Sequence, residues 1–166
     1  MTDPRLAYAV DRAEIQDLQA RYLFALDWFD ADAYADCFTE DGVLDWALGI
    51  VEGRETIRAE AHGMPKALAA YFADDGSGRP KRLRHYITNI VVQIAGDRAT
   101  GQAYWMETSN DTPDGSARIG GFGHYQDELH RVNGKWLFSR RKIFNELLDG
   151  RCAEASNPVR EMGGER

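Results

Sequence analysis

The second half of the chain is a series of strand-like segments joined by short turns, and this pattern strongly restricts the fold. Branched and aromatic residues, which favour β-strands, are concentrated in residues 81–94, 98–109, 117–132 and 136–143. Asn133 and Gly134 separate the last two segments and are typical of a type I′ hairpin turn. A tight turn is also predicted at 95–97, and the glycine-rich stretch 120–123 predicts a bulge or strong bend. We therefore predict consecutive, hairpin-linked strands.

The first half of the chain is mainly helical. Apolar residues recur at helical spacing over residues 11–29, with Asp11 as a plausible N-cap and Glu14 three residues later. A short helix is predicted at 30–38, followed by a turn at 40–42 and a strand at 43–48. Residues 49–53 form a turn-rich link that could include a short piece of strand. Two helices are predicted at 54–61 and 65–73, with a break around 63–65.

Helices that precede hairpin-linked strands imply an α+β fold whose helices and sheet form separate layers. A bent sheet that wraps a long helix leaves a pocket between its concave face and that helix. The length of 166 residues fits one domain. We predict that this domain spans residues 1–145 and that residues 146–166 form a polar, loose tail.

Composition excludes several functions. The hydrophobic fraction of 43% indicates a folded domain, and the net charge of −7 would repel nucleic acids and anionic membrane surfaces. Cys37 and Cys152 lie in unlike contexts without metal-binding spacing, which favours free thiols in a reducing compartment. The N-terminus has no signal-peptide pattern, and no segment reaches transmembrane length. We predict a cytoplasmic protein with no nucleic-acid or membrane partner.

His85 and Asn89 interrupt an apolar strand face. With a side-chain period of two, both residues share a face with Leu83, Ile87 and Val91. A histidine whose pKa is near its ordinary value of about 6.5 can accept or donate a proton at cellular pH. Asn89 could bind a substrate oxygen or be a satisfied structural amide.

Asp27 is the second unusual polar residue. The polar stripe of its helix contains Glu14, Asp17 and Arg21, whereas Asp27 lies about 110° away among apolar residues. A carboxylate in this position is either a surface group near the helix end or a buried group with a partner. The helix pattern leaves both alternatives open.

Five segments of the chain resemble the SnoaL-like branch of the nuclear-transport-factor-two-like superfamily. Together they cover residues from about 10 to 145, which is nearly the whole predicted domain. The matching segments are Ala25-Leu26-Asp27, Tyr34-Ala35-Asp36-Cys37-Phe38-Thr39-Glu40-Asp41-Gly42, Gly53-Arg54-Glu55-Thr56-Ile57-Arg58, Arg84-His85-Tyr86-Ile87-Thr88-Asn89 and Tyr125-Gln126-Asp127-Glu128-Leu129-His130-Arg131-Val132-Asn133-Gly134-Lys135-Trp136.

The resemblance implies a cone-shaped α+β barrel, in which a curved mixed or antiparallel sheet wraps the long helix around a pocket, and a homodimer or homotrimer. Scytalone dehydratase, bile-acid dehydratase and hexachlorocyclohexane dehydrochlorinase in this superfamily use a histidine paired with an aspartate. His85 and Asp27 occupy the matching positions. Trp46 matches a pocket tryptophan of the dehydrochlorinase, and Tyr22 resembles a tyrosine of the dehydratases. Tyr104 or Trp105 stands where scytalone dehydratase has a second histidine.

These residues predict cofactor-independent chemistry on a small hydrophobic cyclic molecule. His85 would be a general base oriented by Asp27. Tyr22 and Tyr104 could donate to a developing enolate or serve only in packing, and Trp46 would line the pocket. His124, on the glycine-rich strand, is a candidate second acid. Arg54, Arg140 and Arg141 are most simply structural, although one inward-facing arginine could orient a carboxylate-bearing substrate. Asp45 is expected to be exposed.

The leading reaction is dehydration by β-elimination, catalysed by a lyase, and the second is double-bond isomerisation of the ketosteroid-isomerase type. A non-catalytic alternative is a ligand-binding module or one like the small subunit of a ring-hydroxylating dioxygenase. That alternative, which includes a dimerisation domain, predicts a filled or shallow pocket and an assembly surface on the exposed face of the sheet. The sequence has no metal-ligand pattern, phosphate loop or dinucleotide fingerprint, so we expect no metal and no cofactor.

Overall fold

A computed structural model describes residues 3–69 and 76–162 of the chain. Its helices are α1 (Pro4–Asp27), α2 (Ala31–Ala35), α3 (Arg54–Ala67) and α4 (Pro158–Glu161). Its strands are β1 (Phe38–Trp46), β2 (Gly49–Glu52), β3 (Leu83–Ala95), β4 (Arg98–Ser109), β5 (Arg118–Val132) and β6 (Lys135–Asn145).

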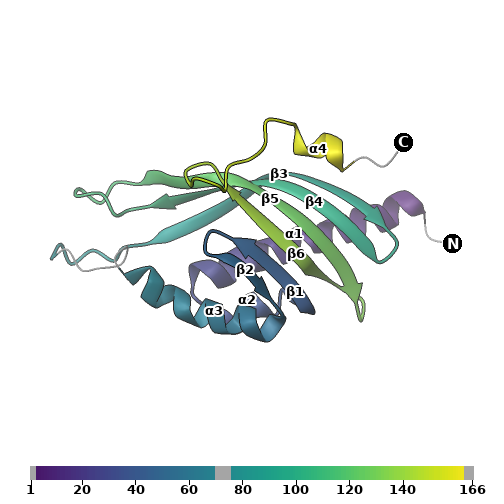
Figure 1. The fold of residues 1–166 in the computed structure, drawn as a ribbon, viewed down its shortest axis with the longest axis horizontal. Helices are drawn as coiled ribbons and strands as arrows, with labels where there is room; N and C mark the ends of the chain where they lie inside the picture. Colours follow the sequence, from purple (N-terminus) through teal and green to yellow (C-terminus); the bar gives the residue numbers. More distant parts are fainter. Residues whose placement is uncertain (1–2, 70–75, 163–166) are drawn as a thin grey trace.

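The strands form one six-stranded sheet in the order β2-β1-β6-β5-β4-β3. The β1–β6 pair is parallel and the other pairs are antiparallel. The curved sheet lies over α1, with α2 and α3 on the same side (Figure 1). The predicted α+β class is confirmed. The sheet has β2 and β3 as open edges and is not closed into a barrel.

Several local predictions are confirmed and others are wrong. Asn133 and Gly134 have φ angles of 51° and 76°, as a type I′ turn requires. The predicted turn at 40–42 instead lies inside β1, where the pairing with β6 shifts register between Phe38 and Val43. The long helix begins earlier than predicted, because the Asp3 side chain caps it and Pro4 occupies its first position.

The predicted break around residues 63–65 is also wrong, since α3 continues through Pro65. Ile57, Ala61 and Met64 lie on one buried face of α3, and this face packs against the rest of the protein up to the residue before Pro65. The end of the predicted second segment, residues 70–73, lies outside the described residues.

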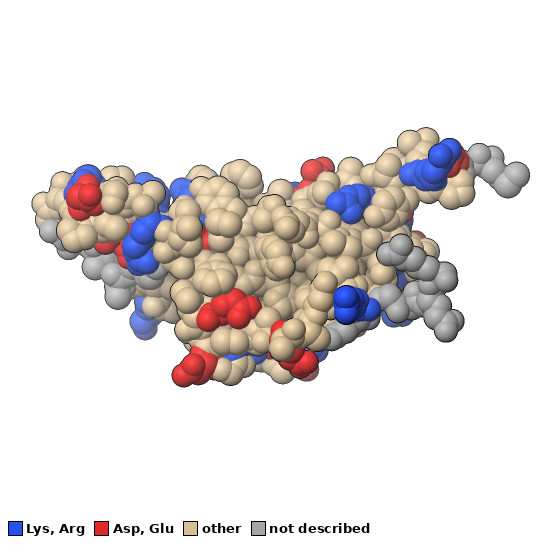
Figure 2. Space-filling view, turned by 90° about the horizontal axis from the view of Figure 1, so that it is seen from above, with Lys and Arg blue, Asp and Glu red and all other residues tan. Residues whose placement is uncertain are grey.

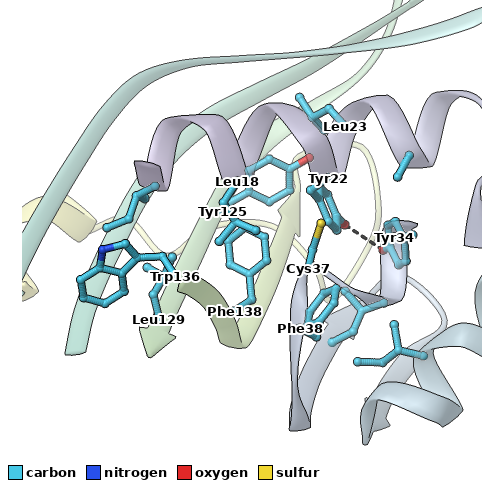
Figure 3. Close-up of a cluster of buried hydrophobic side chains, with 14 of the residues drawn as sticks. Leu18, Tyr22, Leu23, Tyr34, Cys37, Phe38, Tyr125, Leu129, Trp136 and Phe138 are labelled. Atoms are coloured by element: carbon cyan, nitrogen blue, oxygen red, sulfur yellow. Dashed lines mark hydrogen bonds between the residues drawn. The ribbon is translucent and has the colours of Figure 1, made fainter. Parts of the chain in front are cut away.

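The core is built where α1 meets β1, β5 and β6. The side chains of Leu18 and Tyr22 on α1 point toward Phe38, Tyr125 and Phe138 on the sheet (Figure 3). The ring of Tyr22 packs against the aromatic rings of the sheet, with centroid distances of 6.1 Å to Phe38 and 5.7 Å to Phe138. This packing fixes the position of α1 against the sheet.

A fully buried ion pair lies within this core. Both side chains of the Arg141–Asp127 pair are 0% exposed, and two hydrogen bonds of 2.8 and 2.7 Å join them. The guanidinium also lies over the rings of Tyr22, Tyr125 and Phe138, 3.9–4.3 Å from their centroids. Arg141 therefore has a structural role, as the sequence predicted.

Asp45, predicted to be exposed, is in fact buried. Its two carboxylate oxygens accept hydrogen bonds from Arg140, at 3.0 Å, and from Arg151, at 2.8 Å. Arg151 belongs to the segment that was predicted to be a loose tail. The backbone N–H of Asn145 also donates to the carbonyl of Arg151, so this part of the tail is attached to the sheet.

The outer face of the sheet carries exposed apolar side chains. Tyr86 and Phe122 flank Met106 in one cross-strand row, and Tyr104 and Ile119 lie beside it. In the view from above, charged side chains form small separate groups among a larger area of other residues (Figure 2). Such a surface suits the homodimer or homotrimer implied by the family resemblance, which stays a prediction.

None of the described helices is both long and apolar enough to cross a bilayer.

Candidate active site

A cavity of about 340 Å³ lies between the inner face of the sheet, α1 and the end of α3. Its wall is mainly apolar and aromatic, which is typical of small-molecule sites. Among the described residues that line it, only His85, Glu107 and three tyrosines are ionisable. The lining residues are Tyr22, Leu26, Tyr34, Trp46, Ala47, Leu48, Met64, Ala67, Leu68, Leu83, His85, Trp105, Glu107, Tyr125, Ile143 and Asn145.

Asp27 and His85 are in direct contact at this cavity. Oδ1 of Asp27 lies 2.6 Å from Nδ1 of His85, and Oδ2 accepts the backbone N–H of His85 at 2.9 Å. The Asp27 side chain is only 5% exposed. Of the two alternatives left open by the helix pattern, the buried carboxylate with a partner is therefore correct. Two bonds from one carboxylate fix the imidazole ring and direct its Nε2 away from α1.

Glu107 on β4 is a third member of the site, and it was not predicted from the sequence. It is paired with His85 across the β3–β4 ladder, and its Oε2 lies 3.2 Å from His85 Nε2. Its Oε1 accepts the backbone N–H of Gly121 on β5 at 2.9 Å. His85 thus lies between two carboxylates, with Asp27 on one ring nitrogen and Glu107 on the other.

A β-bulge explains why Glu107 was missed. The tight turn at 95–97 pairs Ala95 with Arg98, and the same register extended along β3 would place Thr108 opposite His85. The register shifts by one residue between Thr88 and Val91, so Glu107 takes that place instead. No feature of the sequence located the bulge on this strand.

The same bulge moves Asn89 out of the site. Asn89 has a φ of 53° and its side chain is exposed, so the strict alternation from His85 ends before it. Tyr104 and His124 also do not line the cavity. Tyr104 is exposed on the outer face, while the ring of His124 stacks on Phe144 with centroids 4.3 Å apart. Their neighbours Trp105 and Tyr125 line the cavity instead.

Tyr22 and Trp46 line the cavity, in agreement with their predicted place in the pocket. The hydroxyl of Tyr22 is 2.8 Å from the hydroxyl of Tyr34, which also lines the cavity (Figure 3). Burial raises the pKa of Tyr22 above its ordinary value of 10.0, although the nearby Arg141 charge opposes this. Burial also raises the pKa of Tyr34 well above 10.0, so both tyrosines are neutral hydrogen-bonding groups at cellular pH.

The two carboxylates determine the charge of His85. Burial by itself lowers the pKa of His85, but hydrogen bonds and charge from Asp27 and Glu107 outweigh it and raise the pKa to about 9. Burial acts to raise the pKa of Glu107, yet its bonds to His85 and Gly121 bring it below the usual 4.5. At neutral pH the ring is an imidazolium and Glu107 is ionised.

In the described part of the chain, no group of three or more histidine, cysteine or acidic residues is arranged to hold a metal ion.

Comparison with known protein families assigns the chain to one family. The model of the SnoaL-like domain matches residues 7–142, so the chain belongs to the SnoaL-like family. The family predicted from the sequence is therefore confirmed. A comparison with curated proteins finds no match.

Three solved structures illustrate the similarity. A protein of unknown function from Mycobacterium tuberculosis is 30% identical, with a TM-score of 0.71 over 86% of this chain and 76% of that chain. An NTF2-like protein with a cystatin-like fold from Novosphingobium aromaticivorans is 27% identical, with a TM-score of 0.69 over 98% and 97%. A protein from Catenulispora acidiphila, solved in complex with S-DNPA, is 26% identical, with a TM-score of 0.67 over 84% and 96%. Family, fold and cavity together indicate a protein that binds a small molecule.

Proposed function

We propose that the protein is a cofactor-independent acid–base enzyme that acts on a small hydrophobic cyclic molecule. The leading reaction is dehydration by β-elimination, and the second is double-bond isomerisation. Both reactions move a proton next to a carbonyl group, and both need a positioned acid–base group in a site that excludes water. His85 is the group that exchanges a proton with the substrate, and Asp27 orients it. A cytoplasmic location stays a prediction.

One observation carries this proposal. The carboxylate of Asp27 holds both the ring and the backbone of His85, and the opposite ring nitrogen faces a mainly apolar cavity. Deep burial of a bonded His–Asp pair is also compatible with a structural role. The pair lies at the wall of an open cavity of about 340 Å³, however, and a purely structural pair has no need of one.

The cavity also weighs against the non-catalytic module. That alternative predicts a filled or shallow pocket, whereas the space beside His85 is large enough for a small ring system. The ligand S-DNPA in the Catenulispora acidiphila neighbour supports small-molecule binding by this fold. Because that ligand does not identify a substrate for this protein, the test uses two compounds, one for each candidate reaction.

The test measures turnover of a β-hydroxytetralone, which gives a fluorescent naphthol on loss of water, and of a β,γ-unsaturated cyclic ketone. Replacing His85 with alanine is expected to lower kcat/KM by 10²–10⁴-fold for whichever compound the protein converts. His62→Ala is the control, since His62 is an exposed histidine on α3 outside the cavity. If His85→Ala turns over both compounds as fast as the wild-type protein, the proposed function is wrong.

A further inference from the structure

A protonated imidazole and an ionised carboxylate, those of His85 and Glu107, lie side by side at the cavity. Nε2 of His85 and Oε2 of Glu107 are 3.2 Å apart, and both residues line the same apolar wall. The Glu107 side chain is 17% exposed, so its carboxylate is accessible from the cavity, whereas that of Asp27 lies behind the ring. A substrate in the cavity can therefore reach His85 and Glu107 together.

We propose that Glu107 is the catalytic base and that His85, held between two carboxylates, is the catalytic acid. This inference rests on the proposed function and assigns its two proton transfers to separate residues. It replaces the prediction that His85 alone removes the substrate proton. The raised pKa of His85 and the lowered pKa of Glu107 agree with these roles, because an acid must start protonated and a base must start ionised.

The proton balance of a dehydration is closed within this pair. Glu107 takes the proton from the carbon next to the carbonyl, and the C–H electrons form the new C=C bond. The C–O bond to the leaving hydroxyl breaks, and the Nε2 proton of His85 completes a water molecule. Glu107 is then protonated and His85 is neutral. Transfer of that proton from Glu107 to Nε2 across 3.2 Å restores the starting state.

The charges at the site select the substrate class. Two carboxylates, those of Asp27 and Glu107, flank the single imidazolium of His85, so acidic groups outnumber basic ones at the site. No described residue that lines the cavity is lysine or arginine. The three arginines predicted to be structural bond elsewhere. Arg54 donates to the carbonyl of Phe38, Arg140 to Asp45 and Arg141 to Asp127. An uncharged ring compound with a carbonyl fits this site, and a carboxylate-bearing compound is repelled.

Two glycines on β5 position the carboxylate of Glu107, one by leaving space and the other by donating a hydrogen bond. A Cβ added at Gly120 would lie 2.5 Å from Oε1 of Glu107, and Gly121 provides the N–H that Oε1 accepts. A side chain at position 120 would therefore displace the carboxylate from His85. Glycine at this position is explained by the placement of Glu107.

The remaining charges near the pair do not alter this assignment. Asp27 faces His85 from α1, Glu107 faces it from β4, and the charge of Arg118 on β5 helps to lower the pKa of Glu107. Arg84, the neighbour of His85 on β3, donates to the carbonyl of Asp27 and lies 3.9 Å over the Trp28 ring.

The first test is Glu107→Gln, which keeps the shape of the side chain and removes the base. We expect kcat/KM for the β-hydroxytetralone to fall 10²–10⁴-fold, with partial recovery in Glu107→Asp, which restores a carboxylate. Glu128→Gln is the matched control, because Glu128 is an exposed glutamate on β5 that lies outside the cavity. Gly120→Ala should also reduce activity, whereas Gly63→Ala, where an added Cβ meets nothing within 4 Å, should not.

The pH profile separates the possible outcomes. With His85 as the acid, kcat/KM of the wild-type protein falls as pH rises through about 9, because the proton to be donated is lost. If kcat/KM instead rises through that pH, or if Glu107→Gln keeps wild-type activity while His85→Ala loses it, this inference is overturned and the proposed function stands. If neither variant loses activity, the proposed function fails as well.

Discussion

Replacing Asp27 with asparagine is expected to lower kcat/KM by 10²–10⁴-fold while the protein remains folded. The carboxylate accepts two N–H groups of His85. Oδ2 accepts the backbone N–H at 2.9 Å, and Oδ1 accepts the ring Nδ1–H at 2.6 Å. An asparagine has one acceptor oxygen and one donor group, so it cannot accept both. Its amide carries no negative charge and can donate to Nδ1, so the imidazolium that supplies the Nε2 proton loses one of its two stabilising carboxylates.

The measurement compares kcat/KM and thermal unfolding of Asp27→Asn with those of Asp17→Asn. Asp17 is an exposed aspartate on the polar stripe of the same helix, so its replacement controls for the change of charge on α1. An Asp27→Asn protein that is folded and has wild-type kcat/KM would show that orientation of His85 by Asp27 is not required.

Replacing Asp127 with alanine is expected to have the largest effect on stability. The change leaves the Arg141 guanidinium buried without its counter-charge, since both side chains are 0% exposed. Breaking a buried pair in this way costs about 3–5 kcal/mol of unfolding free energy. In a chain of this size, each kcal/mol lowers Tm by roughly 2–4 °C, so a shift on the order of 10 °C is expected.

Two further variants make this result interpretable. Asp97→Ala breaks an ion pair with Arg131 whose aspartate side chain is 79% exposed, and it should cost about 0–1 kcal/mol. Replacing Asp127 with leucine and Arg141 with methionine removes both buried charges and should recover much of the stability lost in Asp127→Ala. Equal losses in Asp127→Ala and Asp97→Ala, measured by urea unfolding, would contradict the account of the core.

The sequence predicted the α+β class and the main elements because strand composition, helical periodicity and turn residues are local signals. It also identified Asp27 and His85, since each interrupts an otherwise apolar pattern. That the two side chains meet depends on how α1 packs against β3. Periodicity within either element contains no information about that packing.

Two errors in the site, the missed Glu107 and the misplaced Asn89, have one physical origin. The bulge between Thr88 and Val91 changes both the register and the direction of side chains on β3. It brings Glu107 opposite His85 and turns Asn89 to the surface, and neither change is visible in an alternating pattern. Asp45 was assigned to the surface for a related reason. Its partner Arg151 is 106 residues away in the chain, and no local pattern links the two.

The charge of His85 is the central claim, and an NMR titration of its ring measures that charge directly. The chain has four histidines, so the His85 signals can be identified by their loss in His85→Gln. We expect a midpoint near pH 9 in the wild-type protein and lower midpoints in Asp27→Asn and in Glu107→Gln, because each removes one of the carboxylates that stabilise the imidazolium. A wild-type midpoint at or below the ordinary value of about 6.5, unchanged in both variants, would contradict the account.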